Sequence, residues 1–140
     1  MLEYLNTYIN EFKQLCINKS IQTQDIDRLV DNIINGLPDQ ELKSIELYDY
    51  ISKILSSCVI KDPVYSNLAS EYTIKIYDET IGKNYMEIIN RQYQNELISQ
   101  EFYDFVNQHQ ERISKIIVWE RDNLIEYFGL KTLEKSYLLK

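Results

Sequence analysis

The chain has 140 residues, 44% hydrophobic and 26% charged, which is the composition of one ordinary folded domain. Its three glycines and two prolines are too few for a loop-rich all-β protein or a flexible linker. The formal net charge of −7 repels phosphate backbones and anionic lipids, so we expect neither a nucleic-acid nor a membrane partner. The N-terminus lacks the pattern of a signal peptide and no apolar run is long enough to span a membrane, so a cytoplasmic location is expected.

Apolar residues recur at steps of three and four along the first 60 residues, which is the spacing of amphipathic helices. Gly36 and Pro38 are expected to end the second of three helices, and Ser44 to cap the third. The residues predicted to face inward are Leu2, Leu5, Ile9, Phe12 and Cys16, then Ile26, Leu29, Val30, Ile33, Ile34 and Leu37, then Ile45, Tyr48, Ile51, Leu55 and Cys58.

The same spacing continues in the second half of the chain. Asp62 and Pro63 form a typical helix start, Gly82 is expected to end that helix, and Ser99 to cap a later one. We expect a further short helix to end at Gly129 and another to open at Thr132. The predicted inward residues are Tyr65, Leu68, Ala69, Tyr72 and Ile76, then Met86, Ile89 and Tyr93, then Phe102, Phe105, Val106 and His109. No alternating strand pattern occurs, so we predict an all-α fold, an orthogonal array of about seven short helices.

Groups able to carry catalysis are scarce. His109 is the only histidine, and Cys16 and Cys58 are far apart in sequence, so neither a zinc site nor a Cys–His nucleophile is expected. The glycines are isolated and form no phosphate-binding loop. The sequence therefore predicts no metal, no cofactor and no catalytic residue, and the cysteines are interpreted as free thiols in a reducing compartment.

One cluster is open to two interpretations. The sequence WERD at 119–122 combines Trp119, Glu120, Arg121 and Asp122 directly after an apolar run. In the structural interpretation Asp122 caps the following helix and Arg121 pairs with a carboxylate. In the other interpretation the cluster is part of a functional site.

The cluster and the sequence after it resemble a known family. WERD at 119–122 and YFGLKTLEKSYLLK at 127–140 are similar, nearly residue for residue, to a passage near the N-terminus of the class I ribonucleotide reductase large subunit. Trp119 replaces the usual tyrosine, and Leu130 the usual phenylalanine. The resemblance implies interaction or motif positions at Trp119, Glu120, Arg121, Asp122, Tyr127, Phe128, Gly129, Lys131, Thr132, Glu134 and Tyr137.

The resemblance is weaker before residue 119 and implies two parts, expected to form one compact unit. Residues 1–60 resemble the helices of the family's ATP-cone, the module that senses ATP and dATP, and residues 61–140 resemble the helical segment that follows it. The cone's β-hairpin and its phosphate-contacting motif are missing. Its nucleotide-contacting threonine and aspartate fall at Ser44 and Tyr48, so we expect a degenerate cone that binds no nucleotide.

The resemblance also implies what the chain does. The sequence stops at Lys140, before the family's barrel with its radical and redox cysteines, so no catalysis is expected from this polypeptide alone. We expect the N-terminal segment of a ribonucleoside-diphosphate reductase large chain, with the barrel portion as partner and the apolar end at Tyr137, Leu138 and Leu139 as contact. The alternative is a stand-alone truncated paralogue that binds a reductase large subunit and regulates it.

Overall fold

The computed structural model describes residues 2–137, apart from the side chains of residues 2 and 3. Within this range the chain forms seven α-helices and one 3-10 helix and no strand, which confirms the predicted all-α class. The helices are α1 (Leu2–Asn18), α2 (Thr23–Asn35), α3 (Ser44–Ser57), α4 (Val64–Thr80), α5 (Tyr85–Gln94), α6 (Gln100–Ile116), the 3-10 helix η1 (Trp119–Leu124) and α7 (Tyr127–Ser136).

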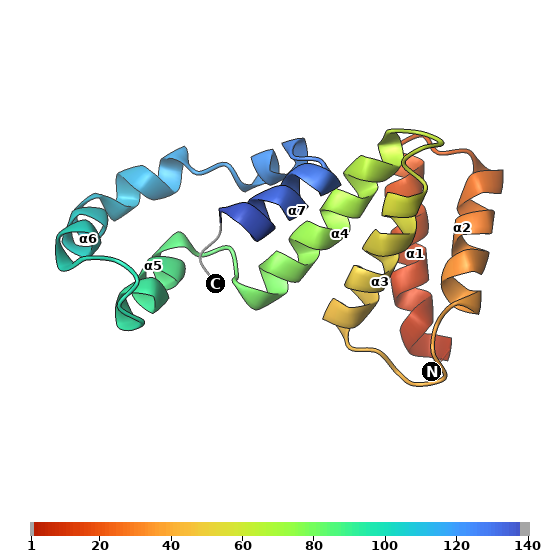
Figure 1. The fold of residues 1–140 in the computed structure, drawn as a ribbon, viewed down its shortest axis with the longest axis horizontal. Coiled ribbons are helices and arrows are strands. Elements are labelled where there is room, and N and C mark those ends of the chain that lie inside the picture. Colours follow the sequence, from red (N-terminus) through yellow and green to blue (C-terminus); the bar gives the residue numbers. More distant parts are fainter. Residues whose placement is uncertain (1, 138–140) are drawn as a thin grey trace.

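The molecule is elongated, with the central helix α4 shared by its two ends. Figure 1 shows α1–α4 grouped at one end, α5 and α6 at the other, and η1 with α7 returning over α4. The principal contacts between helices follow this arrangement: α4 packs on α3, α7 and η1, whereas α5 packs on α6. No helix of residues 2–137 combines the length and apolar character needed to cross a membrane.

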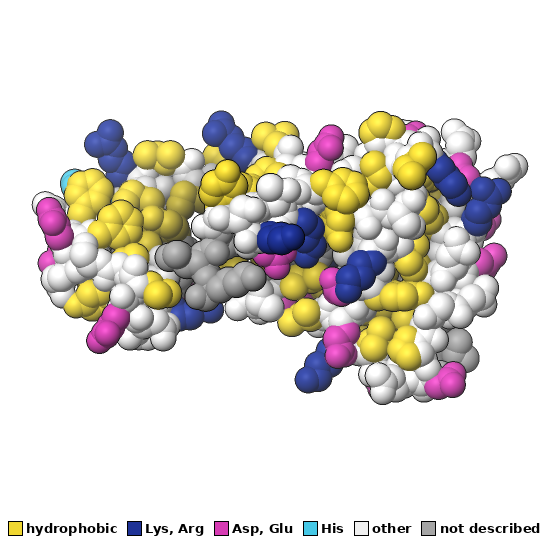
Figure 2. All heavy atoms as spheres, viewed as in Figure 1, with side chains coloured by type: hydrophobic (Ala, Val, Ile, Leu, Met, Phe, Trp, Pro, Cys, Tyr) yellow, Lys and Arg dark blue, Asp and Glu magenta, His cyan; other side chains and the backbone are white. Residues whose placement is uncertain are grey.

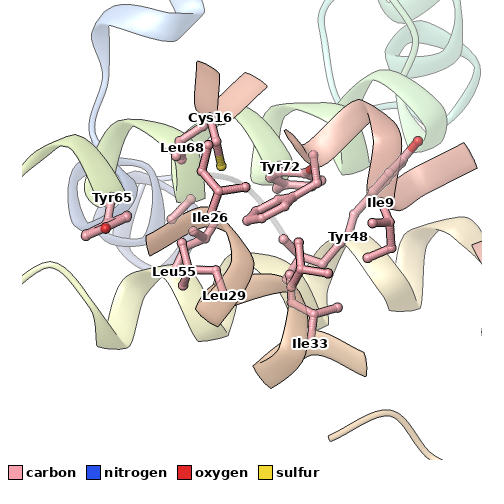
Figure 3. Close-up of a cluster of buried hydrophobic side chains, with 14 of the residues drawn as sticks. Ile9, Cys16, Ile26, Leu29, Ile33, Tyr48, Leu55, Tyr65, Leu68 and Tyr72 are labelled. Carbon is pink, nitrogen blue, oxygen red and sulfur yellow. The ribbon is translucent and has the colours of Figure 1, made fainter. Parts of the chain in front are cut away.

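The main core lies among α1–α4 because each of these helices turns an apolar stripe inward. Phe12 is completely buried there, as the stripes predicted. So are Cys16, Ile33, Leu55 and Leu68 (Figure 3). Tyr48 and Tyr72 meet in the same core with ring centroids 5.8 Å apart. The first four helices therefore enclose a hydrophobic interior without a disulfide, and Cys16 and Cys58 are free.

Three of the predicted helix boundaries are confirmed, two by side-chain hydrogen bonds and one by backbone conformation. Asp62 Oδ1 accepts the backbone N–H of Val64 at 2.8 Å, and Ser99 Oγ accepts that of Phe102 at 3.2 Å. Gly82 follows the end of α4 with φ +85°, in the left-handed region that favours glycine. Local chemistry thus fixes where α4 begins and ends and where α6 begins.

The prediction that Ser44 caps α3 is wrong. Ser44 is the first residue of the helix, and its hydroxyl donates to the Glu79 carboxylate at 2.6 Å. The backbone N–H of Lys43 instead donates to Glu46 Oε2 at 2.9 Å, so the Glu46 side chain caps the start of α3.

The prediction that one helix ends at Gly129 and another opens at Thr132 is also wrong. α7 runs unbroken through both positions, and the Thr132 hydroxyl donates to the Phe128 carbonyl inside the helix at 2.8 Å. Gly129 is a point of close approach instead, because an added Cβ would lie 3.2 Å from Cγ2 of Ile125.

Several residues predicted to face inward are exposed. Ile34, near the end of α2, exposes 45% of its surface, and Ile45, at the start of α3, exposes 36%. On α6 only Val106 is buried, and Phe102 and Phe105 are exposed, because the principal contact of α6 in the described part of the chain is with α5. The side chain of Leu2 lies outside the part of the chain that the structure describes.

Candidate functional site

The predicted motif residues fold back on α4 and form one surface, which we call the α4–α7 site (residues 119–137 with the face of α4 beneath them). Tyr127 and Leu130 are the buried residues of α7 and point towards the core. The hydroxyl of Ser70 on α4 donates to the carbonyl of Ile125, in the link between η1 and α7. This bond holds the entry of α7 against α4, since a part-buried carbonyl needs a donor.

A three-residue network joins the outer part of α7 to α4. Lys131 Nζ lies 3.0 Å from Glu134 Oε2, and the Tyr77 hydroxyl donates to the same oxygen at 3.1 Å. The hydrogen bond from Lys131 lowers the pKa of Glu134. Burial, and then the negative charge of Glu134, raises the pKa of Tyr77 to about 12. The tyrosine therefore stays neutral and donates its proton to an ionised carboxylate.

A groove of about 200 Å³ opens beside this network, between the end of α4, α5 and η1. Trp119 and Asp122 of the WERD cluster line it together with Ile74, Tyr77, Asp78, Ile81, Gly82, Ile88 and Leu130. Burial, and then the charge of Asp78, raises the pKa of Asp122. Lys83 Nζ pairs with Asp78 at 2.9 Å, so the groove combines apolar walls with two carboxylates and one nearby ammonium.

The structural interpretation of the WERD cluster is wrong for the described residues. Glu126, not Asp122, precedes α7, and no side chain accepts a hydrogen bond at that helix start. Arg121 is exposed and forms no ion pair within residues 2–137. The cluster forms η1, whose last turn is closed by the backbone bond from Ile125 N–H to the Asp122 carbonyl at 3.2 Å.

The remaining motif residues face outward. Glu120, Phe128, Thr132 and Tyr137 are exposed, and Tyr137 leaves 76% of its surface uncovered. Leu138, Leu139 and Lys140, the rest of the predicted apolar end, lie outside the described residues. The structure therefore divides the motif into a part that packs on α4 and a part that is open to solvent.

The other predicted positions, Ser44 and Tyr48, lie on α3, outside the α4–α7 site. Tyr48 is buried, 5.7 Å between ring centroids from Tyr8, and burial raises its pKa to about 12. Ser44 is engaged with Glu79. A shallow hollow beside them is lined by Tyr4, Tyr8, Glu41, Leu42, Lys43, Ser44 and Ile45.

Sequence reasoning missed the residues of α4 that hold the site. Ser66, Ser70 and Thr73 are buried, and with Tyr77 they follow helical steps of four, three and four. This polar and small-residue stripe was a usable signal, because such residues at that spacing allow a second helix to approach closely. Among the described residues no three His, Cys, Asp or Glu side chains are arranged to hold a metal ion.

Comparison with known proteins identifies the relatives of this chain. No protein-family model matches it. It is 33% identical over 117 residues to the ribonucleoside-diphosphate reductase large chain of Encephalitozoon cuniculi, an alignment that covers 83% of this chain and 15% of that one. It is 32% identical over 124 residues to the large subunit of Plasmodium falciparum, with 83% and 15% covered, and 29% identical over 141 residues to that of Monkeypox virus, with 94% and 18% covered.

The fold and the comparisons together define the class first: an all-α region of a kind found within a much longer enzyme chain. More particularly, the chain matches the N-terminal region of ribonucleotide reductase large subunits, which confirms the resemblance found at 119–140. It spans between 15% and 18% of the length of these relatives.

Proposed function

We propose that this chain serves as the N-terminal segment of a cytoplasmic ribonucleoside-diphosphate reductase large chain, and so takes part in deoxyribonucleotide synthesis. The observation that carries the proposal is the similarity itself, which covers 83% to 94% of the chain. On sequence grounds residues 1–60 are the cone-like part and residues 61–140 the following helical part. The helix α4 joins them, because it packs on α3 and on α7.

The segment is proposed to be non-catalytic by itself. Nucleotide reduction, as the resemblance implies, depends on reactive cysteines. Cys16 is completely buried, and burial raises the pKa of its thiol to about 12, which leaves it protonated and unreactive. Cys58 is half-buried at the C-terminal end of α3.

The cone-like part is proposed to bind neither ATP nor dATP. A phosphate needs donors or positive charge. The one cation that lines the hollow, Lys43, lies there with Glu41, and the Ser44 hydroxyl is directed to the Glu79 carboxylate. The space where an acid would read the nucleotide is filled by Tyr48, which packs in the aromatic core against Tyr8 and Tyr72.

Calorimetric titration tests this part of the proposal. We expect no heat of binding for ATP or dATP up to about 1 mM, the range of weak affinities. Micromolar binding of either nucleotide would overturn the non-binding proposal and leave the assignment to a reductase segment intact.

Docking on the rest of a reductase large chain is proposed to involve the outward part of the α4–α7 site. Leu124, Phe128 and Tyr137 expose 79%, 57% and 76% of their surfaces. Large apolar side chains exposed on η1, on α7 and just after α7 are available for a contact with another protein surface.

Co-purification tests the docking. The tagged chain is expressed with the E. cuniculi large chain from which the matched N-terminal region has been deleted, and we expect an equimolar complex. Phe128→Glu should abolish the complex, whereas Ile60→Glu, at a 98% exposed position between α3 and α4, should not. A free chain in the wild-type experiment, with both proteins folded by circular dichroism, would count against the docking.

A further inference from the structure

Asn35 and Gly36 form the one Asn–Gly pair of the sequence, and the fold places this pair at the C-terminal end of α2. Asn35 is the last residue of the helix, Gly36 is its C-cap, and both are exposed. The pair lies outside the core of α1–α4 and outside the α4–α7 site. Asn35 is therefore in contact with water, at a position that the proposed role in a reductase does not use.

An asparagine followed by glycine brings an electrophile and a nucleophile together in neighbouring residues. The electrophile is Cγ of the Asn35 side-chain amide. The nucleophile is the backbone nitrogen of Gly36, once hydroxide has removed its proton. A bond between the two closes a five-membered ring, and the glycine allows the close approach because it has no Cβ beside the attacking nitrogen.

The end of α2 is closed by two long backbone hydrogen bonds. The N–H of Gly36 donates to the Asn32 carbonyl at 3.2 Å, and that of Leu37 donates to the Ile34 carbonyl at 3.3 Å. Both distances lie at or beyond the long end of the usual range for such bonds. The bond to Asn32 protects the Gly36 nitrogen until the last turn opens. Helix ends open at low free energy, so the protection is partial.

Contact with α3, and not an unusual backbone conformation, favours a glycine at position 36. Its φ of −99° is open to any residue. An added Cβ, however, would lie 2.2 Å from the hydroxyl oxygen of Tyr50 on α3. That hydroxyl donates to the carbonyl of Ile33 at 3.3 Å, so α3 touches the last turn of α2 at this point. The packing of α3 on α2 thus keeps a glycine directly after Asn35.

We propose that Asn35 is a site of spontaneous deamidation. The Gly36 nitrogen bonds to Cγ of Asn35, the bond from Cγ to the side-chain nitrogen breaks, and ammonia leaves. Water then opens the succinimide ring at one of its two carbonyl carbons. Opening at Cγ gives aspartate, and opening at the backbone carbonyl carbon gives isoaspartate, in which the chain runs through the former side chain. One water enters for each ammonia that leaves, and no oxidant or reductant takes part.

Both products disturb the end of α2. A new carboxylate there meets the negative end of the helix dipole. The last turn of α2 has no basic residue to offset it. Figure 2 shows acidic side chains and no lysine or arginine at the lower right of the view, where α2 ends. Isoaspartate also adds one carbon to the backbone before Gly36, which shifts the glycine relative to Tyr50. Deamidation therefore weakens the contact between α2 and α3.

Peptide mass spectrometry of the folded full chain, incubated at pH 7 or pH 8 and then digested with trypsin, follows the reaction. Asn32 and Asn35 fall in the same peptide, between the cleavage sites at Arg28 and Lys43. Asn32 is the internal control, because isoleucine follows it in the same helix. We expect Asn35 to become heavier by one mass unit, faster at pH 8 because hydroxide removes the amide proton, while Asn32 stays unchanged. Enzymatic methylation of the free α-carboxylate should identify isoaspartate among the products.

Two substitutions complete the test. Asn35→Gln should not convert, because a glutamine side chain would have to close a six-membered ring. Asn35→Asp supplies the aspartate product directly, and its midpoint of urea unfolding should lie below those of wild type and Asn35→Gln. An Asn35 that converts no faster than Asn32 at pH 8 would overturn the proposal. An Asn35→Asp midpoint equal to that of the wild type would overturn the weakened contact between α2 and α3. Neither result would affect the docking on a reductase chain, which is measured with a partner and with a variant of α7.

Discussion

Tyr72 and Tyr77, five residues apart on α4, place their hydroxyl groups in opposite situations. The Tyr72 hydroxyl is buried and has no hydrogen-bond partner among the described residues, whereas the Tyr77 hydroxyl donates to Glu134. A buried hydroxyl without a partner costs about 1–3 kcal/mol relative to its hydration in the unfolded chain. Tyr72→Phe should therefore raise the free energy of unfolding by about 1 kcal/mol, measured by urea denaturation.

Tyr77→Phe is the matched control for that change. It removes the same oxygen from the same helix but deletes a bond to a carboxylate, and it should lower the free energy of unfolding by about 1 kcal/mol. Equal effects of the two substitutions would show that the difference in hydrogen bonding does not govern the stability of α4.

Asp122 is expected to make the protein less stable at neutral pH. Its pKa is raised by burial and by the charge of Asp78, so the ionised form is less favourable in the folded chain than in the unfolded one. Asp122→Asn should therefore stabilise the fold at pH 7 by a few tenths of a kcal/mol, because solvent screens much of the repulsion. The gain should shrink as the pH falls through the raised pKa, and vanish once the carboxyl is protonated in both states.

Urea titrations at pH 7 and at pH values down to about 3 follow this dependence. Glu120→Gln changes a neighbouring exposed carboxylate of the same cluster, serves as the control, and should leave stability at pH 7 unchanged. A loss of stability in Asp122→Asn at pH 7 would contradict the prediction.

At the scale of elements, one serine hydrogen bond contributes to the packing of η1 and α7 on α4. Ser70 and Ser66 are both buried on α4. In the part of the chain that the structure describes, only Ser70 has a hydrogen-bond partner, the Ile125 carbonyl between η1 and α7. Ser70→Ala should cost about 1–2 kcal/mol, because it leaves that carbonyl unpaired. Ser66→Ala, the matched control, should be neutral or stabilising.

Trp119 provides the measurement, because the only tryptophan of the chain lies in η1. The midpoint of urea unfolding, followed by Trp119 fluorescence, should lie at a lower urea concentration in Ser70→Ala than in Ser66→Ala. If the two midpoints coincide, the hydrogen bond does not hold η1 and α7 on α4.

The helices that the sequence predicted best are those whose partners are also helices of this chain. The stripes of α1 and α4 are buried as expected, with Phe12 and Leu68 at their centres. The same reasoning failed for Phe102 and Phe105 of α6. The spacing of apolar residues shows that a helix has a hydrophobic face, but it does not show what covers that face.

The candidate site divides in a similar way. The residues at 119–137 were predicted through the resemblance, and the structure places them on η1 and α7. Their packing partners Ser70 and Tyr77 were missed, because polar residues on a helix are ordinarily assigned to its solvated face. Gly129 was interpreted as a helix end, whereas its missing side chain makes room for Ile125. A glycine indicates that a Cβ is excluded, and only the fold shows whether conformation or contact excludes it.

At the scale of the whole molecule, α5 and α6 form an arm that is weakly joined to the body of α1–α4. The arm is held together by its own contacts, Val106 and the Tyr93–Tyr103 stack, whereas the principal contacts of α4 are with α3, α7 and η1 (Figure 1). Units with few buried contacts to the rest of a protein open independently and at low free energy. We therefore expect the arm to exchange its amide hydrogens faster than the body.

Two cavity-forming substitutions separate the arm from the body. Val106→Ala should speed hydrogen exchange in α5 and α6 several-fold and leave α1–α4 unchanged, because the lost packing lies within the arm. Leu68→Ala, in the completely buried core, should cost about 2–5 kcal/mol and speed exchange throughout the described chain. Equal loss of protection in α1–α4 for both variants would mean that arm and body unfold as one unit, and that the outward face of α6 is presented by a rigid molecule rather than by a separately opening arm.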